Sequence, residues 1–257
     1  GKGLIGGVDM GWASGAKDKI LTDWAASAVK SAREGTGVPA GFSGGRHRGR
    51  PTMRPMPETA IDFPTLRLIG WPYAGLPDDA VWAGLFAAHP QAKPARVSEQ
   101  HRSGYVVADG PEAALKAESL PEWQKPRFPS HERAAVGDWV LLEGKKIVAL
   151  LPRHTSIKRG AAGEHYHQQV IAANVDTAFI VCGLDDDFNP RRIERYLMLV
   201  GGGGAEPVVV LTKADQTDYA PDAVDTLAEL AAQDITVCAV NAKDPASVAS
   251  LHSWLGA

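Results

Sequence analysis

The sequence has few cysteines and no long apolar run. Of its 257 residues only Cys182 and Cys238 are cysteines, and each lies in an apolar stretch where a free thiol behaves as a small buried hydrophobe. This excludes a disulfide framework. No unbroken apolar run reaches the roughly 18 residues of a membrane-spanning helix. Without a signal-peptide pattern either, the sequence predicts a soluble protein of the reducing cytoplasm. We expect this protein to be a monomer.

An excess of basic residues is also lacking. The formal net charge is -3, with 44% hydrophobic and 22% charged residues, which is typical of globular domains. Binding to nucleic acid therefore requires a local basic patch.

The third absence is a phosphate-binding loop of the pattern GxxxxGK[ST]. The four glycines at 201–204 follow a predicted helix and indicate a helix end and turn instead. The stretch "EPVVVLTKAD" nevertheless ends in Thr212-Lys213-Ala214-Asp215, a tetrapeptide of the kind that selects guanine in GTPases. Such a tetrapeptide normally lies downstream of the phosphate loop, yet none precedes it here.

Composition divides the chain into four parts. Residues 1–57 are rich in Gly, Ala, Ser and Arg, which predicts a disordered or extraneous N-terminal extension. Residues 58–92 form a lead-in segment with one helix near 78–88. Short strands separated by turns indicate an OB-type β-barrel in residues 93–160. In residues 161–257, Val/Ile-rich strands alternate with helices, which predicts a parallel sheet covered on both faces. The fold class is therefore α/β plus a small all-β domain.

Candidate ligand-binding residues follow two consecutive strands of this sheet. Ligands of open parallel sheets bind outside the carboxyl ends of the strands. The Asp215 carboxylate can accept hydrogen bonds from guanine N1–H and the 2-amino group, which adenine cannot supply. The stem of Lys213 can cover one face of the base, and the Thr212 hydroxyl can tether the loop.

A second tripeptide, Asn241-Ala242-Lys243, follows the next strand. The N–H of Ala242 can donate to guanine O6, with Asn241 bracing the turn and Lys243 covering the other face of the base. The alternative is that Thr212–Asp215 simply ends a strand and is solvated. The acidic run Asp185-Asp186-Asp187 is interpreted as a solvated loop that leads into a helix.

The barrel segment carries a basic fringe. OB-type barrels commonly bind oligonucleotides with cations for phosphates and aromatics for stacking. Tyr105 and Trp139 are the available aromatics, although either can belong to the core. The candidate RNA-binding residues are Arg96, Arg102, Lys125, Arg127, Arg153, Lys158 and Arg159. A merely solvated set of charges remains the alternative.

At this point the sequence resembles the ribosome small-subunit-dependent GTPases of bacteria, the RsgA or YjeQ family, which are circularly permuted. The resemblance runs from about Asp62 to the end, and it rests on "HRSGYVVADG", "AVGDWVLLEG", "LLPRHTSIKRG", "QQVIAANVDTAFIVCGLDDDFNPRRIERYLMLV" and "PVVVLTKAD". In that family the OB barrel comes first. The guanine boxes precede the phosphate loop, the switch regions and a zinc-binding domain.

This order implies a phosphate loop beyond Ala257, so that the chain given holds the guanine-recognition half of a GTPase site and does not hydrolyse GTP alone. The resemblance further implies GTP/GDP, Mg²⁺ and structural Zn²⁺ as cofactors, although the metal ligands have no counterpart here. It implies the small (30S) ribosomal subunit and its rRNA as partners. No catalytic residue or metal ligand is assigned.

Two other functions stay open on the sequence alone. One is a non-catalytic RNA-binding module, and the other is an unrelated α/β nucleotide-binding enzyme. Asn241 departs from the pattern of the family, because GTPases usually have Ser at this position.

Overall fold

The computed structural model describes residues 61–160, 168–218, 220–227 and 234–255. The predicted extension 1–57 lies outside these ranges.

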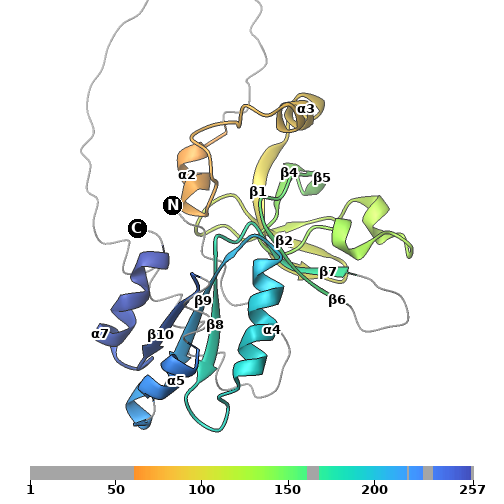
Figure 1. The fold of residues 1–257 in the computed structure, drawn as a ribbon. Coiled ribbons are helices and arrows are strands. Elements are labelled where there is room, and N and C mark those ends of the chain that lie inside the picture. Colours follow the sequence, from red (N-terminus) through yellow and green to blue (C-terminus); the bar gives the residue numbers. More distant parts are fainter. Residues whose placement is uncertain (1–60, 161–167, 219, 228–233, 256–257) are drawn as a thin grey trace, which may run out of the picture. The chain divides into compact units, whose positions relative to one another are not determined.

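Five short strands form the first sheet (Figure 1). They are β1 (Lys93–His101), β2 (Gly104–Ala108), β3 (Leu115–Ala117), β4 (Trp139–Glu143) and β5 (Lys146–Leu150), in the antiparallel order β3-β2-β1-β4-β5. A parallel bridge between Glu118 and Lys146 joins the end of β3 to β5. There the N–H of Glu118 donates to the Lys145 carbonyl at 2.7 Å. This contact closes the sheet into the five-stranded barrel of OB type predicted from the sequence.

Side chains from all five strands fill the barrel. Val97, Val107 and Val140 are almost fully buried in this core. Tyr105 is also buried, and its ring meets that of Trp123 edge-on with centroids 5.8 Å apart. Trp123 comes from η1 (Pro121–Gln124), which precedes η2 (Ser130–Glu132) in the connection to β4. Tyr105 is therefore a core residue rather than an exposed stacking platform.

The lead-in segment packs on the outer side of β4. It contains α2 (Phe63–Leu68) and α3 (Ala80–Ala88), and α3 lies at the predicted 78–88 position. Trp71 meets Trp139 of β4 edge-on at 4.8 Å between centroids, and Trp82 of α3 at 5.5 Å. Trp139 is 1% exposed, so the second candidate aromatic is buried as well.

A two-stranded hairpin follows the barrel. It consists of β6 (Ser156–Gly160) and β7 (Gln168–Ala173), so the boundary predicted at 160/161 falls between its strands. Ile157 packs into the core of the α/β part, and the Ser156 N–H donates to the Gly203 carbonyl at 2.9 Å. On the other strand, the Ala173 N–H donates to the Val136 carbonyl at 2.9 Å. The hairpin therefore bonds to both the barrel segment and the α/β segment.

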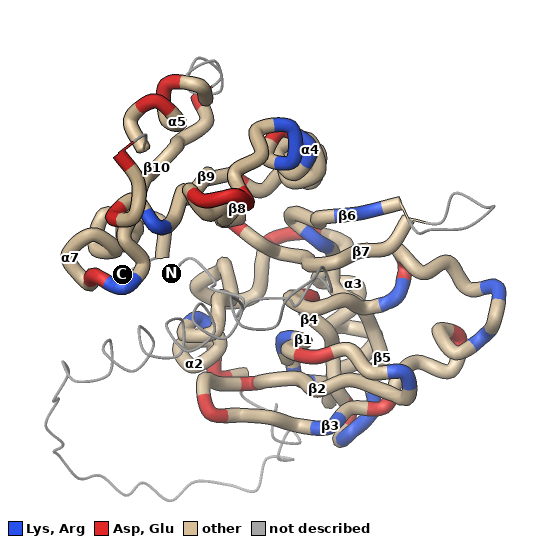
Figure 2. Tube along the Cα trace, turned by 90° about the horizontal axis from the view of Figure 1, so that it is seen from below, with Lys and Arg blue, Asp and Glu red and all other residues tan. Residues whose placement is uncertain are grey.

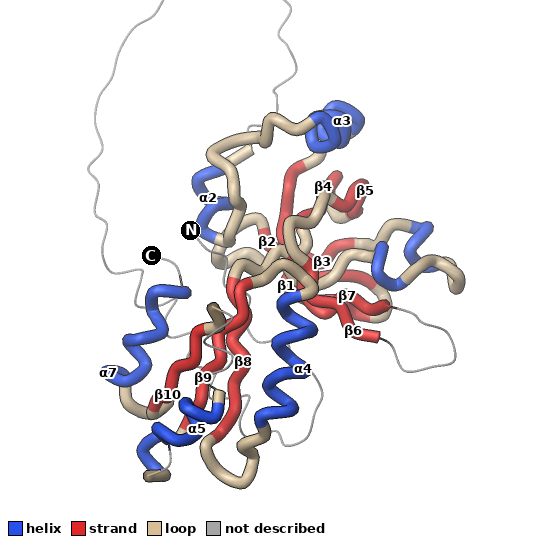
Figure 3. Tube along the Cα trace, viewed as in Figure 1, coloured by secondary structure: helices blue, strands red, loops and turns tan. Residues whose placement is uncertain are grey.

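The α/β part alternates strands and helices (Figure 3). Its elements are β8 (Thr177–Gly183), α4 (Pro190–Gly201), β9 (Glu206–Thr212), η3 (Ala214–Gln216), α5 (Ala220–Thr226), β10 (Thr236–Val240), α7 (Pro245–Val248) and η4 (Ala249–Trp254). The strands are parallel in the order β10-β9-β8. This confirms the predicted parallel sheet.

Both faces of β9 are buried. On one face Val209 packs with Ile193 and Leu197 of α4. On the other face Val208 and Val210 pack with Leu251 of η4. This two-sided burial explains the continuous apolar run "VVVL". Within the described residues, no helix combines the length and apolarity needed to cross a bilayer.

Candidate functional site

The two candidate ligand loops leave neighbouring strands at the same level. In the parallel register, Thr212 at the end of β9 pairs with Val240 at the end of β10 and with Gly183 at the end of β8. The structure therefore brings residues 212–215 and 241–243 to one edge of the sheet, where open α/β sheets bind ligands.

The first loop turns sharply at Lys213. This residue has a φ of +63°, in the left-handed region, and the short helix η3 follows directly. The Gln216 N–H donates to the Lys213 carbonyl at 3.0 Å and closes the turn. Asp215 is exposed, and its carboxylate makes no hydrogen bond or ion pair with the residues that the structure describes. Two acceptor oxygens thus stay available to a ligand.

Thr212 and Lys213 are both tied to the end of β8. The Leu184 N–H donates to the Thr212 carbonyl at 2.9 Å. The Thr212 hydroxyl lies 3.5 Å from the Cys182 carbonyl, which is long for a hydrogen bond and makes it a weak tether. The Lys213 ammonium forms an ion pair with the Asp185 carboxylate.

The second loop is held by side chains. The Asn241 Oδ1 accepts the N–H of Lys243 at 2.9 Å, which shows that asparagine braces this turn. The N–H of Asn241 itself donates to the Ser247 hydroxyl at 2.9 Å, a contact that sequence reasoning missed. The N–H of Ala242, by contrast, has no partner among the described residues. Lys243 is exposed.

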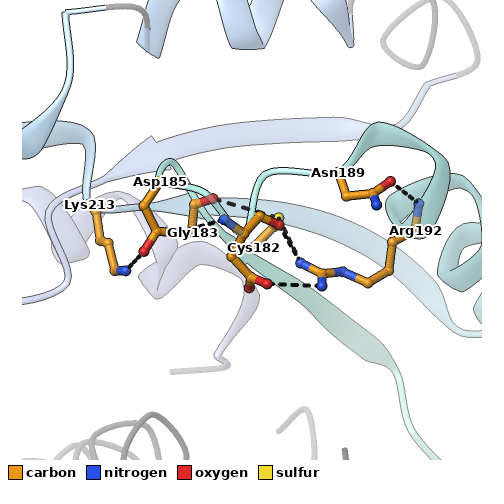
Figure 4. Close-up of polar contacts among 7 residues, drawn as sticks. Cys182, Gly183, Asp185, Asn189, Arg192 and Lys213 are labelled. Atoms are coloured by element: carbon orange, nitrogen blue, oxygen red, sulfur yellow. Dashed lines mark hydrogen bonds and ion pairs between the residues drawn. The ribbon is translucent and has the colours of Figure 1, made fainter. Parts of the chain in front are cut away.

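The loop between β8 and α4 is more ordered than the solvated acidic run expected from the sequence (Figure 4). Asp185 Oδ1 accepts the N–H of Asp187 at 3.2 Å. Arg192 of α4 donates to Asp187 Oδ1 at 3.0 Å and to its carbonyl at 2.5 Å. The hydrogen bond to the Asp187 carboxylate, followed by one to Cys182 Sγ, raises the pKa of Arg192 above its ordinary value. Asn189 caps α4 by accepting the Arg192 N–H at 3.1 Å. Sequence reasoning gave no role to Asp185 or Arg192.

This arrangement offers hydrogen-bonding groups rather than metal ligands. Within the described ranges, no three His, Cys, Asp or Glu side chains lie close enough together to hold a metal ion. A carboxylate acceptor at Asp215 and an N–H donor at Ala242 that has no partner among the described residues are complementary to the N1–H, 2-amino and O6 groups along one edge of guanine.

Most of the candidate RNA-binding residues are on the surface. Figure 2 shows basic residues along β6 and on the connections of the barrel segment. Arg159 is exposed and donates to Gln169 Oε1 of β7 at 3.1 Å. The exposed candidates are Arg102, Lys125, Arg127, Lys158 and Arg159.

Two of the candidates are instead internal, which corrects the expectation for Arg96 and Arg153. Arg96 is 7% exposed and donates to the carbonyls of Ile69 and Asn174 at 2.6 and 2.8 Å. Arg153 donates to the fully buried carboxylate of Asp138 at 2.8 and 2.6 Å. Both guanidinium groups satisfy internal acceptors, so neither is free to bind a phosphate.

Comparison with known proteins agrees with the predicted resemblance. Residues 150–257 match the family model described as RsgA GTPase. The chain is 77% identical over 201 residues to the small ribosomal subunit biogenesis GTPase RsgA of Xanthomonas axonopodis pv. citri (strain 306), and the same holds for that of Xanthomonas campestris pv. campestris (strain B100). These alignments cover 78% of this chain and 55% of each relative. The chain thus spans about half the length of the curated relatives it matches.

Two solved structures are also similar. The circularly permuted GTPase YloQ gives a TM-score of 0.43 at 20% identity, with 62% of this chain and 55% of that chain covered. YjeQ from Thermotoga maritima gives 0.47 at 18% identity, with 64% and 57% covered. These TM-scores are low, so the architecture rests on the strand pairings themselves. The sequence matches confirm the resemblance to the RsgA family.

Proposed function

We propose that this RsgA-like chain is the RNA-binding and base-recognition part of a GTPase that assists late maturation of the small ribosomal subunit. Thr212–Asp215 and Asn241–Lys243 bind the guanine base of GTP or GDP in this proposal. The exposed cations of the barrel and of β6 bind rRNA, and the protein works in the cytoplasm as a monomer.

The N–H of Ala242, which has no partner among the residues that the structure describes, is the observation that carries the nucleotide assignment. The N–H of Asn241 donates to the Ser247 hydroxyl of α7 and that of Lys243 donates to Asn241 Oδ1, whereas the N–H of Ala242 is left for a ligand. The exposed carboxylate of Asp215 lies on the adjacent loop. A donor and an acceptor on adjacent loops favour guanine, because adenine has an amino donor where guanine has O6 and lacks the N1–H and 2-amino donors.

Hydrolysis needs groups that this chain does not contain. Phosphoryl transfer depends on a phosphate cradle and Mg²⁺ to position and stabilise the transferred group, and the 257 residues include no GxxxxGK[ST] segment. We therefore expect this chain to bind the base without hydrolysing GTP. Structural zinc stays an implication of the resemblance.

Ligand-observed NMR with GDP and ADP tests the proposal, because it detects the weak binding expected without phosphate contacts. The chain is expected to bind GDP and to give no signal with ADP at equal concentration. Asp215→Asn should weaken GDP binding about 100-fold, since two charge-assisted hydrogen bonds are lost at roughly 1.5 kcal/mol each. The same variant should bind xanthosine diphosphate better, because an amide N–H can donate to the xanthine 2-carbonyl.

Asp218→Asn is the matched control, as it removes one exposed charge three residues away. Equal binding of GDP and ADP by the unaltered chain would favour the unrelated nucleotide enzyme. RNA binding without any nucleotide binding would favour the non-catalytic module.

A further inference from the structure

The Lys213 side chain is anchored from outside its own loop. Its ammonium pairs with Asp185, which lies 28 residues earlier at the end of the neighbouring strand β8. The side chains of Lys213 and Asp185 are 29% and 37% exposed, so the pair is partly shielded from solvent. Ion pairs of this kind are stronger than fully exposed ones, because water screens them less.

Asp185 is itself held in place. Its Oδ1 accepts the N–H of Asp187, which leaves Oδ2 for Lys213. Arg192 clamps Asp187 from α4 through both the side chain and the carbonyl. A chain of contacts therefore runs from α4 through the loop at 185–187 to Lys213, as Figure 4 shows.

The backbone around the pair is adapted to it. A Cβ atom on Gly183 would lie 2.6 Å from Asp185 Oδ1 and 3.6 Å from Lys213 Cε. Any side chain at position 183 would thus require the Asp185 carboxylate to shift from the position in which it pairs with Lys213. The glycine at the end of β8 provides the space in which the two side chains meet.

From these contacts we propose that Asp185 is a positioning residue for the guanine site. It holds the Lys213 side chain in one orientation, so that the stem is already in place to cover the base when a nucleotide binds. This inference rests on the proposed function, because it assigns Asp185 a role in that same site. Because the long side chain is already ordered before binding, less conformational entropy is lost when a ligand binds, and the affinity for every ligand that the stem covers increases. Selection of the base remains with Asp215.

The test compares Asp185→Asn with Asp186→Asn in the 257-residue chain. Asp186 is an exposed carboxylate in the same loop and provides the matched control. Asp185→Asn should weaken GDP binding about threefold to tenfold, in keeping with the loss of one partly shielded ion pair. Asp186→Asn should stay within about twofold of the unaltered chain, since exposed charges contribute little. Asp185→Glu should recover part of the loss.

A double-mutant cycle separates positioning from general destabilisation. If Asp185 acts through Lys213, the variant Asp185→Asn/Lys213→Met binds GDP no more weakly than Lys213→Met alone. Independent, additive losses from the two substitutions would overturn the proposal. So would an Asp185→Asn chain that binds GDP as well as, or better than, the unaltered chain.

A second readout needs no nucleotide. Lys213 acylation by an N-hydroxysuccinimide ester, mapped by mass spectrometry, should be faster in Asp185→Asn than in Asp186→Asn, because the amine loses its carboxylate partner. Equal labelling in the two variants refutes the positioning role whatever the nucleotide experiment gives. Equal binding of GDP and ADP by the unaltered chain refutes the proposed function, and with it any role of Asp185 in a guanine site.

Discussion

At the scale of single residues, Gly183 gives a sharp prediction because it has no catalytic or hydrogen-bonding side chain to lose. Gly183→Ala adds one methyl group that would lie 2.6 Å from Asp185 Oδ1, closer than real Cβ atoms approach. The carboxylate must then shift from the position in which it pairs with Lys213. We expect GDP binding to weaken about threefold to tenfold, as in Asp185→Asn.

Ligand-observed NMR measures this effect, with Gly160→Ala as the control. A Cβ at Gly160 would meet no atom within 4 Å. If Gly183→Ala binds GDP normally, the side chains have room to rearrange and the glycine is not required for the pair.

The individual residues also show the limits of pattern reading. The tetrapeptide at 212–215 is local in sequence, so its place at a strand end was predictable. The partners of its lysine were not, because Asp185 is 28 residues away and is brought close only by the pairing of β8 with β9. The bracing contact of Asn241 spans only two residues, so it could be proposed from the sequence, and the structure then showed the hydrogen bond itself.

At the scale of elements, Arg153 links the exit of the barrel to the connection before β4. Besides Asp138, it donates to the carbonyls of His131 and Arg133 at 2.6 Å each. The Asp138 side chain is 0% exposed, whereas that of Arg153 is 17% exposed. Arg153→Met therefore leaves a buried carboxylate without its charged partner. We expect a loss of about 3–5 kcal/mol in the free energy of unfolding, measured by urea denaturation.

The dependence of this loss on pH identifies its cause. Burial raises the pKa of Asp138 above its ordinary 3.8, while hydrogen bonds and charge from Arg153 oppose that shift. With a raised pKa the folded state binds the proton more readily than the unfolded chain, so stability falls as pH rises through the range above 3.8. Without Arg153 the pKa rises further. Lowering the pH protonates the buried carboxylate and removes its unpaired charge. The loss in the free energy of unfolding caused by Arg153→Met should therefore become smaller as the pH is lowered.

Lys158→Met is the control for this experiment, because Lys158 is exposed and carries no buried partner charge. Its stability should change by less than about 0.5 kcal/mol. If the loss in the free energy of unfolding of Arg153→Met stays constant with pH, the role assigned to the buried carboxylate is contradicted.

At the scale of the whole molecule, the net charge of -3 gives no general attraction to RNA. In the proposed function RNA binds to the five exposed candidate residues Arg102, Lys125, Arg127, Lys158 and Arg159, and the number of phosphate contacts sets the salt dependence of the affinity. With five phosphate contacts, the logarithm of the binding constant for single-stranded RNA is expected to fall with the logarithm of the salt concentration at a slope of about -3.5. Lys158→Gln/Arg159→Gln should reduce the slope to about -2.1. Fluorescence anisotropy with a labelled RNA oligonucleotide at several salt concentrations measures both slopes.

Lys145→Gln/Lys146→Gln removes the same charge at the exposed turn between β4 and β5 and serves as the control. An unchanged slope in the first variant, or an equal change in both, would place the RNA elsewhere than on β6.

The sequence by itself determined the order of the elements, the two kinds of sheet and the position of the two candidate ligand loops, 212–215 and 241–243, after neighbouring strands. These features depend on short-range patterns, namely apolar runs, turn residues and tetrapeptides that follow a strand. The tertiary structure alone decided which cations are free. Arg96 and Arg102 are only six positions apart, but Arg96 is buried and donates to the carbonyls of Ile69 and Asn174, whereas Arg102 is exposed.

The same holds for Asp138 and Arg153, and for Asp185 and Lys213. Each pair forms because strand pairing and chain reversal bring distant residues together, and no local pattern records that proximity. Burial then determines the role of a charge: an exposed arginine can bind a phosphate, whereas one enclosed by carbonyls must satisfy them first. At the edge of the sheet, Asp215 and the N–H of Ala242 have no such internal partners within the described part of the chain.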